Sequence, residues 1–302
     1  MSKTVLITGG TGLVGSRLTA LLRQKGYQVR YLSRSPEKVD DIEAFSWDIK
    51  AQTMDSKALE GTDYIVHLAG AGVADQRWTA ERKKAILESR TNSSALLRET
   101  LRSHNHEIKA FISASAIGYY GFDTGTQLLS EDAAPGSDFL ADVTRAWEHE
   151  VEQIADLGIR TAMIRVGIVL SDKGGALEEI SKPVKFGVGA PLGDGDQYMS
   201  WIHIDDLCNM FIHAIEADEA SGPYNGVAPE PVTNREFTKT LASTLNRPMF
   251  MPAVPAFALK LMVGEMANML LGGNKVSSKK IESEGFNFKY PKLKTAMESL
   301  LK

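Results

Sequence analysis

The sequence contains a single cysteine, Cys208, so no disulfide can form within the chain. A reducing compartment is therefore the simpler expectation, and Cys208 itself is best interpreted as a small buried residue of a helix. The N-terminus, MSKTVLITGG, runs directly into a strand pattern and a glycine turn, which leaves no room for a signal peptide. We therefore expect a cytoplasmic protein.

The chain also lacks an excess of positive charge. Its 34 Lys and Arg residues and 38 Asp and Glu residues leave a formal net charge of -4 at pH 7. Nucleic-acid partners call for clustered Lys and Arg, so we expect no nucleic acid. The six histidines show no metal-ligand spacing, and we expect no metal site.

Long uninterrupted apolar runs are absent as well. The most apolar late stretch, residues 253–271, reads AVPAFALKLMVGEMANMLL and is interrupted by Pro255, Lys260 and Glu265. Its methionines recur at helical spacing, which favours a core or interface helix over a membrane span. We therefore expect no membrane partner.

What the chain does contain is enough apolar sequence for a substantial core, at 302 residues and 43% hydrophobic content. Its first half alternates helix-length segments with short apolar runs: TVLIT, YQVRYL, AFSW, YIVHL, AFISAS and TAMIRV. Continuous apolar runs in this alternation indicate parallel strands covered on both faces. The prediction is an α/β fold with a doubly wound parallel (Rossmann) sheet.

The composition changes after about residue 170. DKGGALEE, FGVGAPLGDGDQ and ASGPYNGVAPEPVTN are rich in Gly, Pro and Asp and indicate loops, which often build binding sites. Strands return near SWIHI and PYNGV. We predict a first domain over residues 1–170, with return elements to about 230, and a smaller mixed C-terminal substrate lobe over residues 171–302.

A glycine turn follows the first strand, in GGTGLVGSRLTALLRQKG. Gly9 allows a sharp turn, Gly12 lets phosphates approach the main chain, and Gly15 lets the helix pack close to the strand. The N-terminus of the helix would face the pyrophosphate of a dinucleotide. Because the pattern follows a strand and opens a helix, it predicts a dinucleotide-binding domain over residues 1–170.

The end of the second strand chooses between the two nicotinamide dinucleotides. A carboxylate there binds the ribose 2′-hydroxyl of NAD, whereas a cation accommodates the 2′-phosphate of NADP. The chain has Ser33 and Arg34 in YLSRSPEK, with no acid before Glu37. We therefore predict NADP as the cofactor. The alternative is that Arg34 is a solvated loop charge.

Four motifs together resemble the extended short-chain dehydrogenase/reductase superfamily, specifically its epimerase/dehydratase group: TGGTGLVG, SWDIK, HLAG and SASAIGYYG. The resemblance implies that Asp48 reaches the adenine. It also implies that the glycine turn and the segment beyond the fourth strand line the cofactor, through Gly9, Thr11, Gly12, Leu13, Val14, Gly15, Leu68, Ala69 and Gly70. A homodimer is common in this superfamily and is one expectation here.

Three further segments are similar to an atypical subgroup of proposed sugar-nucleotide epimerases that carry a C-terminal domain of unassigned function: RVGIVLSDKGGAL, LGDGDQYMSWIHIDD and NGVAPEPVTNREF. By this resemblance Arg90, in the helix after the fourth strand, and Val169, in the sixth strand, lie at the cofactor.

The usual catalytic pair of the superfamily is missing. Active members use a Tyr and, four residues on, a Lys, which share one helix face, together with a Ser or Thr that orients the substrate. Ser115 matches the Ser, and Glu148 matches an acidic position that commonly follows the pair. Leu140 and Thr144 then occupy the positions of the Tyr and the Lys. Neither side chain can relay a proton.

Replacement groups are available nearby. Tyr119 or Tyr120, at the end of the fifth strand, could act as an acid or could simply pack. His203 in SWIHIDD could titrate near neutrality or be structural.

Four residues are candidates for contact with a substrate. Gln197 and Trp201 could hydrogen-bond and stack against it. Arg77 and Trp78 could close over the site or merely begin a helix.

Two hypotheses follow. The first is an NADP(H)-dependent oxidoreductase or epimerase acting on a small polar substrate, with a sugar-like one suggested by the resemblance. Ser115 would then orient the substrate, and Tyr120 or His203 would handle protons. The second is a non-catalytic NADP(H)-binding redox sensor or scaffold, which the vacant Leu140 and Thr144 positions support. We favour the enzyme.

Overall fold

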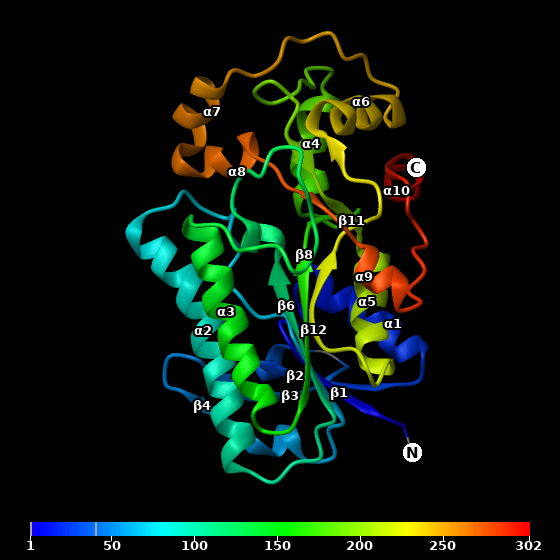
Figure 1. The fold of residues 1–302 in the computed structure, drawn as a ribbon. Coiled ribbons are helices and arrows are strands. Elements are labelled where there is room, and N and C mark those ends of the chain that lie inside the picture. Colours follow the sequence, from blue (N-terminus) through cyan, green and yellow to red (C-terminus); the bar gives the residue numbers. More distant parts are fainter. Residues whose placement is uncertain (1, 40) are drawn as a thin grey trace.

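The computed structural model describes residues 2–39 and 41–302. It is built around one eight-stranded sheet (Figure 1). In spatial order the strands are β12 (Gly222–Gly226), β8 (Arg160–Val166), β6 (Ala110–Ala116), β5 (Tyr64–His67), β1 (Thr4–Thr8), β2 (Gln28–Ser33), β3 (Glu43–Asp48) and β4 (Thr53–Met54). All neighbours pair in parallel except β3 and β4. Each of the six apolar runs forms one of these strands, and the predicted parallel sheet is confirmed.

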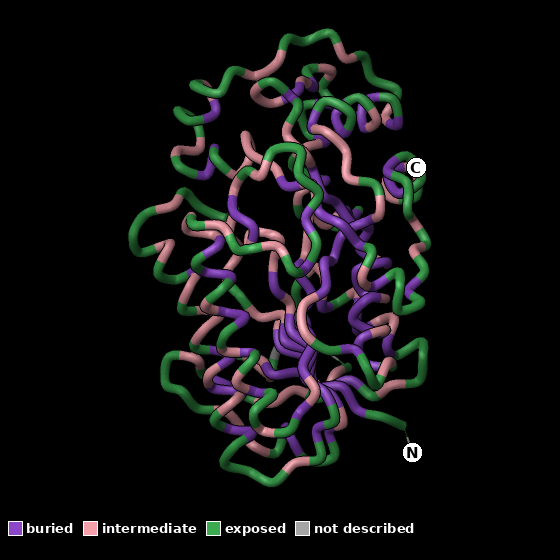
Figure 2. Tube along the Cα trace, viewed as in Figure 1, coloured by how far each residue is buried: buried purple, intermediate pink, exposed green. Residues whose placement is uncertain are grey.

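Helices cover both faces of the sheet. Helices α1 (Leu13–Gln24) and α5 (Ile204–Glu216) lie on one side, and α2 (Ala80–Ser103) and α3 (Phe139–Ala155) lie on the other (Figure 1). Buried residues are concentrated along the strands between these layers (Figure 2). Cys208 is buried on α5, as its sequence context predicted. The doubly wound architecture is therefore confirmed.

The strand order reverses at β1. From β1 the chain continues to β2 and β3 on one side, and β5 and β6 are then added on the other side. In open α/β sheets, ligands bind outside the carboxyl ends of the strands at such a switch point. The glycine turn after β1 and the loop after β5 meet here.

A second set of elements follows, mostly beyond these carboxyl ends. Its helices are α4 (Ala176–Lys185), α6 (Asn234–Thr244), α7 (Ala256–Val263), α8 (Ala267–Leu271), α9 (Lys279–Ser283) and α10 (Leu293–Leu301). Buried residues of α4, α6 and α10 form a separate core, whereas α9 packs beside β12 and its Ile281 belongs to the core of the main sheet. The short strand pairs of this second set are β9 (Ile168–Leu170) with β11 (Trp201–His203), β10 (Tyr198–Met199) with β13 (Val232–Thr233), and β14 (Lys275–Val276) with β7 (Leu128–Leu129). Among the residues that the structure describes, 3₁₀ turns are formed by η1 (Pro36–Lys38), η2 (Ser56–Leu59), η3 (Ile117–Tyr120) and η4 (Gly264–Met266).

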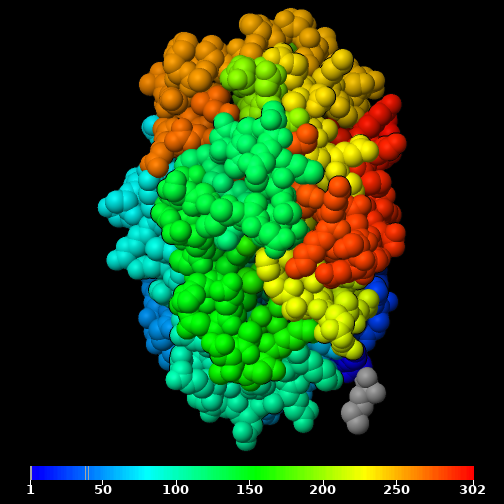
Figure 3. Space-filling model, in the orientation of Figure 1, coloured from blue at the N-terminus to red at the C-terminus, as the bar shows by residue number. Residues whose placement is uncertain are grey.

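The C-terminal residues close the side of the molecule next to β12. Lys280 Nζ donates to the carbonyl of Pro223 at 2.8 Å, and the orange and red segments lie beside the yellow ones in Figure 3. The carboxylate of Asp206 accepts the backbone N–H groups of Lys289 and Tyr290, each at 2.8 Å. The chain end is thereby attached to α5.

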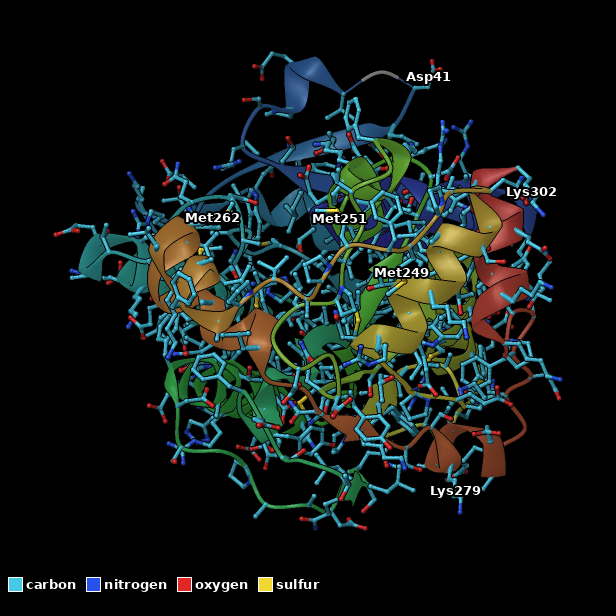
Figure 4. All side chains as sticks on the ribbon, turned by 90° about the horizontal axis from the view of Figure 1, so that it is seen from above. Asp41, Met249, Met251, Met262, Lys279 and Lys302 are labelled. Atoms are coloured by element: carbon cyan, nitrogen blue, oxygen red, sulfur yellow. The ribbon has the colours of Figure 1, made fainter. Side chains whose placement is uncertain are left out.

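The apolar stretch 253–271 does not form one helix. It is divided into α7 and α8 by η4, which begins at Gly264 with φ +65°. Phe257, Leu261 and Met262 are 70–80% exposed, so α7 is not a core helix, and the interface alternative stays a prediction. Figure 4 shows Met262 on α7, with Met251 on the segment that leads to it. Within residues 2–39 and 41–302, no helix combines the length and apolarity needed to cross a bilayer.

Candidate functional site

The glycine turn has the geometry of a phosphate-binding loop. Gly9 has φ +69°, and Gly12 is the N-cap of α1, with its N–H donating to Gly9 O at 3.0 Å. A methyl group on Gly15 would clash with the carbonyl oxygen of Gly9, so only glycine fits there. Amide groups in the first turn of a helix have no intrahelical partner, and Leu13 and Val14 lie in that turn. The exposed Thr11 completes the turn.

The end of β2 presents a cation next to this turn. Ser33 is the last residue of β2, and its hydroxyl accepts the N–H of Ser35 at 3.1 Å. Arg34 follows it and is exposed. No carboxylate that the structure describes lies within ion-pair distance of Arg34. The side chain is therefore available to an anionic ligand.

Asp48, at the end of β3, is exposed and shapes a turn. Its Oδ1 accepts the N–H groups of Lys50 at 2.8 Å and Ala51 at 3.0 Å. Its second carboxylate oxygen has no described partner, so the residue can still accept a hydrogen bond.

The loop after β5 lies directly against the glycine turn. Leu68 N and Ala69 N donate to Thr8 Oγ1, each at 3.1 Å. A methyl group built on Gly9 would come within 3.0 Å of the carbonyl carbon of Leu68. One built on Gly70 would come within 3.2 Å of the guanidinium carbon of Arg90. The two loops therefore form one continuous wall.

Arg90 is a largely buried cation at this wall. Its Nη1 donates to the carbonyls of Ala71 at 3.0 Å and Ile86 at 2.9 Å, and its guanidinium lies 5.1 Å from the Trp147 ring centroid. None of the described carboxylates pairs with it. Burial, with the nearby Arg82 cation, lowers the pKa of Arg90 to about 10. Such a cation suits a polar or anionic ligand.

Val169 lies in β9, the short strand that follows β8. It pairs with Ile202 of β11, and it is half-buried.

Leu140 and Thr144 face the segment that follows β6. Asp138 caps α3 through its Oδ1, which accepts the N–H groups of Leu140 and Ala141. A methyl group on Gly118, in η3, would lie 3.3 Å from Leu140 Cβ and 3.7 Å from Thr144 Oγ1. The Thr144 hydroxyl donates to Leu140 O at 2.7 Å. The two positions therefore lie beside η3.

Ser115 is hydrogen-bonded inside the protein. Its hydroxyl donates to Glu148 Oε1 at 2.5 Å. The same carboxylate accepts both Arg165 Nε and Arg165 Nη2 at 2.8 Å, and all three residues are buried.

Tyr120 belongs to the same buried network. Its hydroxyl donates to Asn225 Oδ1 at 2.7 Å and accepts from Arg165 Nη1 at 3.0 Å. Burial raises the pKa of Tyr120, which makes its proton harder to remove. The Tyr119 ring packs under the Arg165 guanidinium, whose carbon lies 3.5 Å from the ring centroid.

His203 lies apart from the network of Ser115 and Tyr120, and each of its ring nitrogens has a contact within the protein. Nδ1 accepts the N–H of Asp205 at 3.0 Å and so caps α5, and Nε2 lies 3.3 Å from Ser299 Oγ. The ring stacks on Tyr290 with centroids 3.9 Å apart. Burial lowers the pKa of His203 to about 4. It lines a cavity of about 300 Å³ next to the first turn of α1, and no contact joins it to Ser115 or Tyr120.

The four substrate candidates fall into two groups. Trp78 packs between Phe122 and Phe139 and donates from Nε1 to Val73 O at 2.9 Å, and the exposed Arg77 precedes it. Both lie before α2, which begins at Ala80.

The other two candidates belong to the C-terminal elements. Gln197 Nε2 donates to Leu192 O at 3.1 Å and to Leu270 O at 2.9 Å, while its Oε1 is buried without a described partner. Trp201 is fully buried, and its Nε1 donates to Glu230 O at 3.1 Å.

The network that holds Ser115 and Tyr120 was not anticipated from the sequence. The sequence matches Glu148 only to an acidic position and indicates no role for Arg165 or Asn225. One signal was available, because Arg165 is a charged residue inside the apolar run TAMIRV. A charge in a buried strand requires a partner.

Comparison with known proteins identifies relatives over the whole chain. Residues 5–226 match the model of the NAD dependent epimerase/dehydratase family, and residues 254–300 match a domain of unknown function (DUF1731). An epimerase family protein of Staphylococcus aureus (strain NCTC 8325) is 37% identical, with 99% of each chain covered.

Two solved structures are also similar. A crystal structure of human epimerase family protein SDR39U1 with NADPH has a TM-score of 0.88 at 32% identity, and 98% of each chain is covered. A nucleoside-diphosphate sugar epimerase from Corynebacterium glutamicum has a TM-score of 0.82 at 35% identity, covering 99% of this chain and 58% of that one. The resemblance drawn from the sequence motifs is thereby confirmed.

Proposed function

Since the chain belongs to the NAD dependent epimerase/dehydratase family, we propose that it binds NADP(H) at the carboxyl ends of β1, β2 and β5. The observation that carries this proposal is the glycine turn next to Arg34 at the end of β2, which is exposed and has no described carboxylate partner. The human relative was crystallised with NADPH, which supports the same choice of cofactor.

The residues present fit such a group. The first turn of α1 would receive the pyrophosphate, and Arg34 with the Ser33 hydroxyl would receive the 2′-phosphate. Asp48 would contact the adenine. The remainder of the cofactor would be lined by Leu68, Ala69, Gly70, Arg90 and Val169. When bound, the nicotinamide supplies hydride transfer.

The experiment compares two cofactors and two variants. Arg34→Ala should weaken NADPH binding roughly 10–100-fold, the loss expected for charge-assisted hydrogen bonds, and leave NADH binding unchanged. Arg102→Ala is the matched control, because Arg102 is an arginine 63% exposed in the last turn of α2. Equal Kd values for NADPH and NADH in the unmodified protein, measured by calorimetry, would refute the assignment.

We propose further that the cofactor serves an oxidoreductase or epimerase reaction on a small polar, sugar-like substrate. The sugar-nucleotide epimerase among the relatives supports this substrate class. Residues 171–302 would form the substrate lobe. Gln197 and Trp201 would contact the substrate from this lobe, and Arg77 and Trp78 would contact it from the segment before α2. Gln197 is the candidate with an unused acceptor, because its buried Oε1 has no described hydrogen-bond partner.

For proton handling, the proposal assigns Ser115 to orient the substrate and Tyr120 or His203 to exchange protons. Each of these groups must first release a hydrogen bond made within the protein. A turnover screen of NADPH with carbonyl compounds and NADP with alcohols and nucleotide sugars tests the assignment. Loss of any detected turnover in Tyr120→Phe or His203→Asn, with NADPH binding retained, identifies the proton donor.

A second function is favoured by that same closed network. If Ser115 and Tyr120 stay engaged with Glu148, Arg165 and Asn225, the protein would bind NADP(H) without turnover and act as a redox sensor or scaffold. Hydrogen exchange across residues 230–302 should then change on addition of NADPH. A cofactor-insensitive C-terminal region would contradict this function. The cytoplasmic location and the homodimer expected from the sequence stay predictions.

A further inference from the structure

His67, the last residue of β5, is buried at the centre of the sheet and directly precedes the loop Leu68–Gly72. None of its surface is exposed. The rings of Trp47, Phe111 and Trp147 surround the imidazole, with centroids 6.0–6.5 Å away. Its orientation is therefore held by packing.

The hydrogen bonds around His67 determine which nitrogen carries the proton. Thr8 Oγ1 accepts from Leu68 N and Ala69 N, and it lies 2.7 Å from His67 Nδ1. A hydroxyl that already accepts twice has only its own proton left to share. Thr8 therefore donates to Nδ1, and the proton of the neutral ring is on Nε2.

The other side of the ring is consistent with this tautomer. Nε2 lies 3.1 Å from Ser93 Oγ, and the Ser93 hydroxyl donates to Ser89 O at 2.8 Å. Nε2–H can therefore donate to Ser93. Burial, with the Arg90 cation nearby, lowers the pKa of His67 to about 3, so the ring is neutral at physiological pH.

Helix α2, which carries Ser93, also holds the far end of the loop. Ser89 Oγ accepts Ala71 N at 3.0 Å, and Arg90 Nη1 donates to Ala71 O at 3.0 Å. Residues of β1 and α2 thus hold the loop at three points, at Leu68, Ala69 and Ala71. The glycine turn, which begins one residue after Thr8, packs against the same loop.

We propose that His67 is a positioning residue of the cofactor site, which orients the Thr8 hydroxyl so that the loop Leu68–Gly72 is locked against the glycine turn. This proposal rests on the proposed NADP(H) site. A positively charged ring would present N–H at both nitrogens, and Thr8 Oγ1 would then have to release one of the two amides.

A short series of full-length variants tests the role. His67→Asn places an amide oxygen near the position of Nδ1 and keeps an acceptor for Thr8, whereas His67→Leu removes it. The Kd for NADPH should rise roughly tenfold in His67→Leu, the loss that corresponds to one net hydrogen bond, and by no more than about threefold in His67→Asn. This rescue by the conservative variant separates positioning from simple packing.

Ser113→Ala is the matched control. Ser113 is equally buried and lies opposite His67 in the β5–β6 register, but its hydroxyl donates to Ala114 O and not to the loop. Its Kd for NADPH should stay within about twofold of the unmodified value. If His67→Leu does not fold, the isosteric Thr8→Val should show the same tenfold loss and Thr8→Ser should not.

Two further outcomes distinguish failure of the positioning role from failure of NADPH binding itself. An NADPH affinity unchanged in His67→Leu or Thr8→Val refutes the positioning role. If the unmodified protein does not bind NADPH, the proposed function fails. Hydrogen exchange then tests separately whether His67 and Thr8 hold the loop in place. Faster exchange at Leu68 and Ala69 in His67→Leu than in Ser113→Ala supports the lock, and equal exchange refutes it.

Discussion

Replacing Glu148 by Gln should destabilise the protein by about 3–5 kcal/mol, the cost of leaving one member of a buried ion pair without its partner. The Glu148 and Arg165 side chains are only 6% and 3% exposed. The carboxylate takes three hydrogen bonds, from Ser115 Oγ, Arg165 Nε and Arg165 Nη2, at 2.5–2.8 Å. An amide retains an oxygen acceptor but has no charge to balance the guanidinium.

Urea denaturation followed by tryptophan fluorescence measures this loss. Native proteins have about 5–15 kcal/mol of stability, so the variant should still fold but should unfold at a lower urea concentration. Asp142→Asn is the matched control on the same helix, because its ion pair with Arg145 is 52–60% exposed and is worth only about 0–1 kcal/mol.

The double variant Glu148→Met with Arg165→Met separates charge from packing. Since it leaves no unpaired charge, it should lie closer to the unmodified protein than Glu148→Gln does. A loss below about 1 kcal/mol in Glu148→Gln, equal to that of Asp142→Asn, would show that the buried pair does not secure this end of the sheet.

Three further predictions follow from single contacts. Gly15→Ala should abolish NADPH binding measured by fluorescence, because the added methyl clashes with Gly9 O; an unchanged Kd would contradict the turn geometry. In His203 the folded pKa of about 4 lies below the ordinary 6.5, so the residue contributes stability above pH 6.5 that is lost as pH falls towards 4. His203→Asn can still cap α5 but cannot titrate. Its loss of unfolding free energy between pH 7 and 4.5, measured by urea denaturation, should therefore be smaller than that of the unmodified protein by on the order of 2–3 kcal/mol. An equal loss in both proteins would refute the lowered pKa of His203. Asp138→Ala removes the acceptor of Leu140 N and should cost about 1–2 kcal/mol in the same assay, and no loss would mean that the cap is dispensable.

The strands and the helix α3 could be predicted because their signals are local. TAMIRV is almost continuously apolar and forms the buried β8. Val143, Trp147, Val151 and Ile154 recur at helical spacing and are all buried on α3. In both cases the spacing of apolar side chains reports directly on which face is covered.

The stretch 253–271 shows the limit of that reasoning. Its composition suited a buried helix, yet Phe257 and Leu261 of α7 are 76% and 80% exposed. Gly264 ends the helix with a positive φ, and the two short pieces are too short to bury all their apolar side chains. Apolar content predicts a tendency to be buried, but the neighbouring elements decide whether a partner surface exists.

The catalytic candidates show the same limit. Ser115, Tyr120 and His203 were chosen for their chemistry and their places near strand ends. Which hydroxyls are free depends on Arg165 and Asn225, whose contacts with Tyr120 span 45 and 105 residues of chain. No local pattern records such a pairing.

The sequence by itself determined the fold class and the position of the glycine turn, because both depend on short-range rules: the spacing of apolar residues and the sterics of glycine at Gly9 and Gly15. The family followed from the resemblance of several motifs to known proteins. Only the tertiary structure decided that Ser115 and Tyr120 are held by one buried network and that His67 orients Thr8. The physical reason is that a polar side chain withdrawn from water must find a partner in space, and the partner that folding supplies can lie anywhere along the chain.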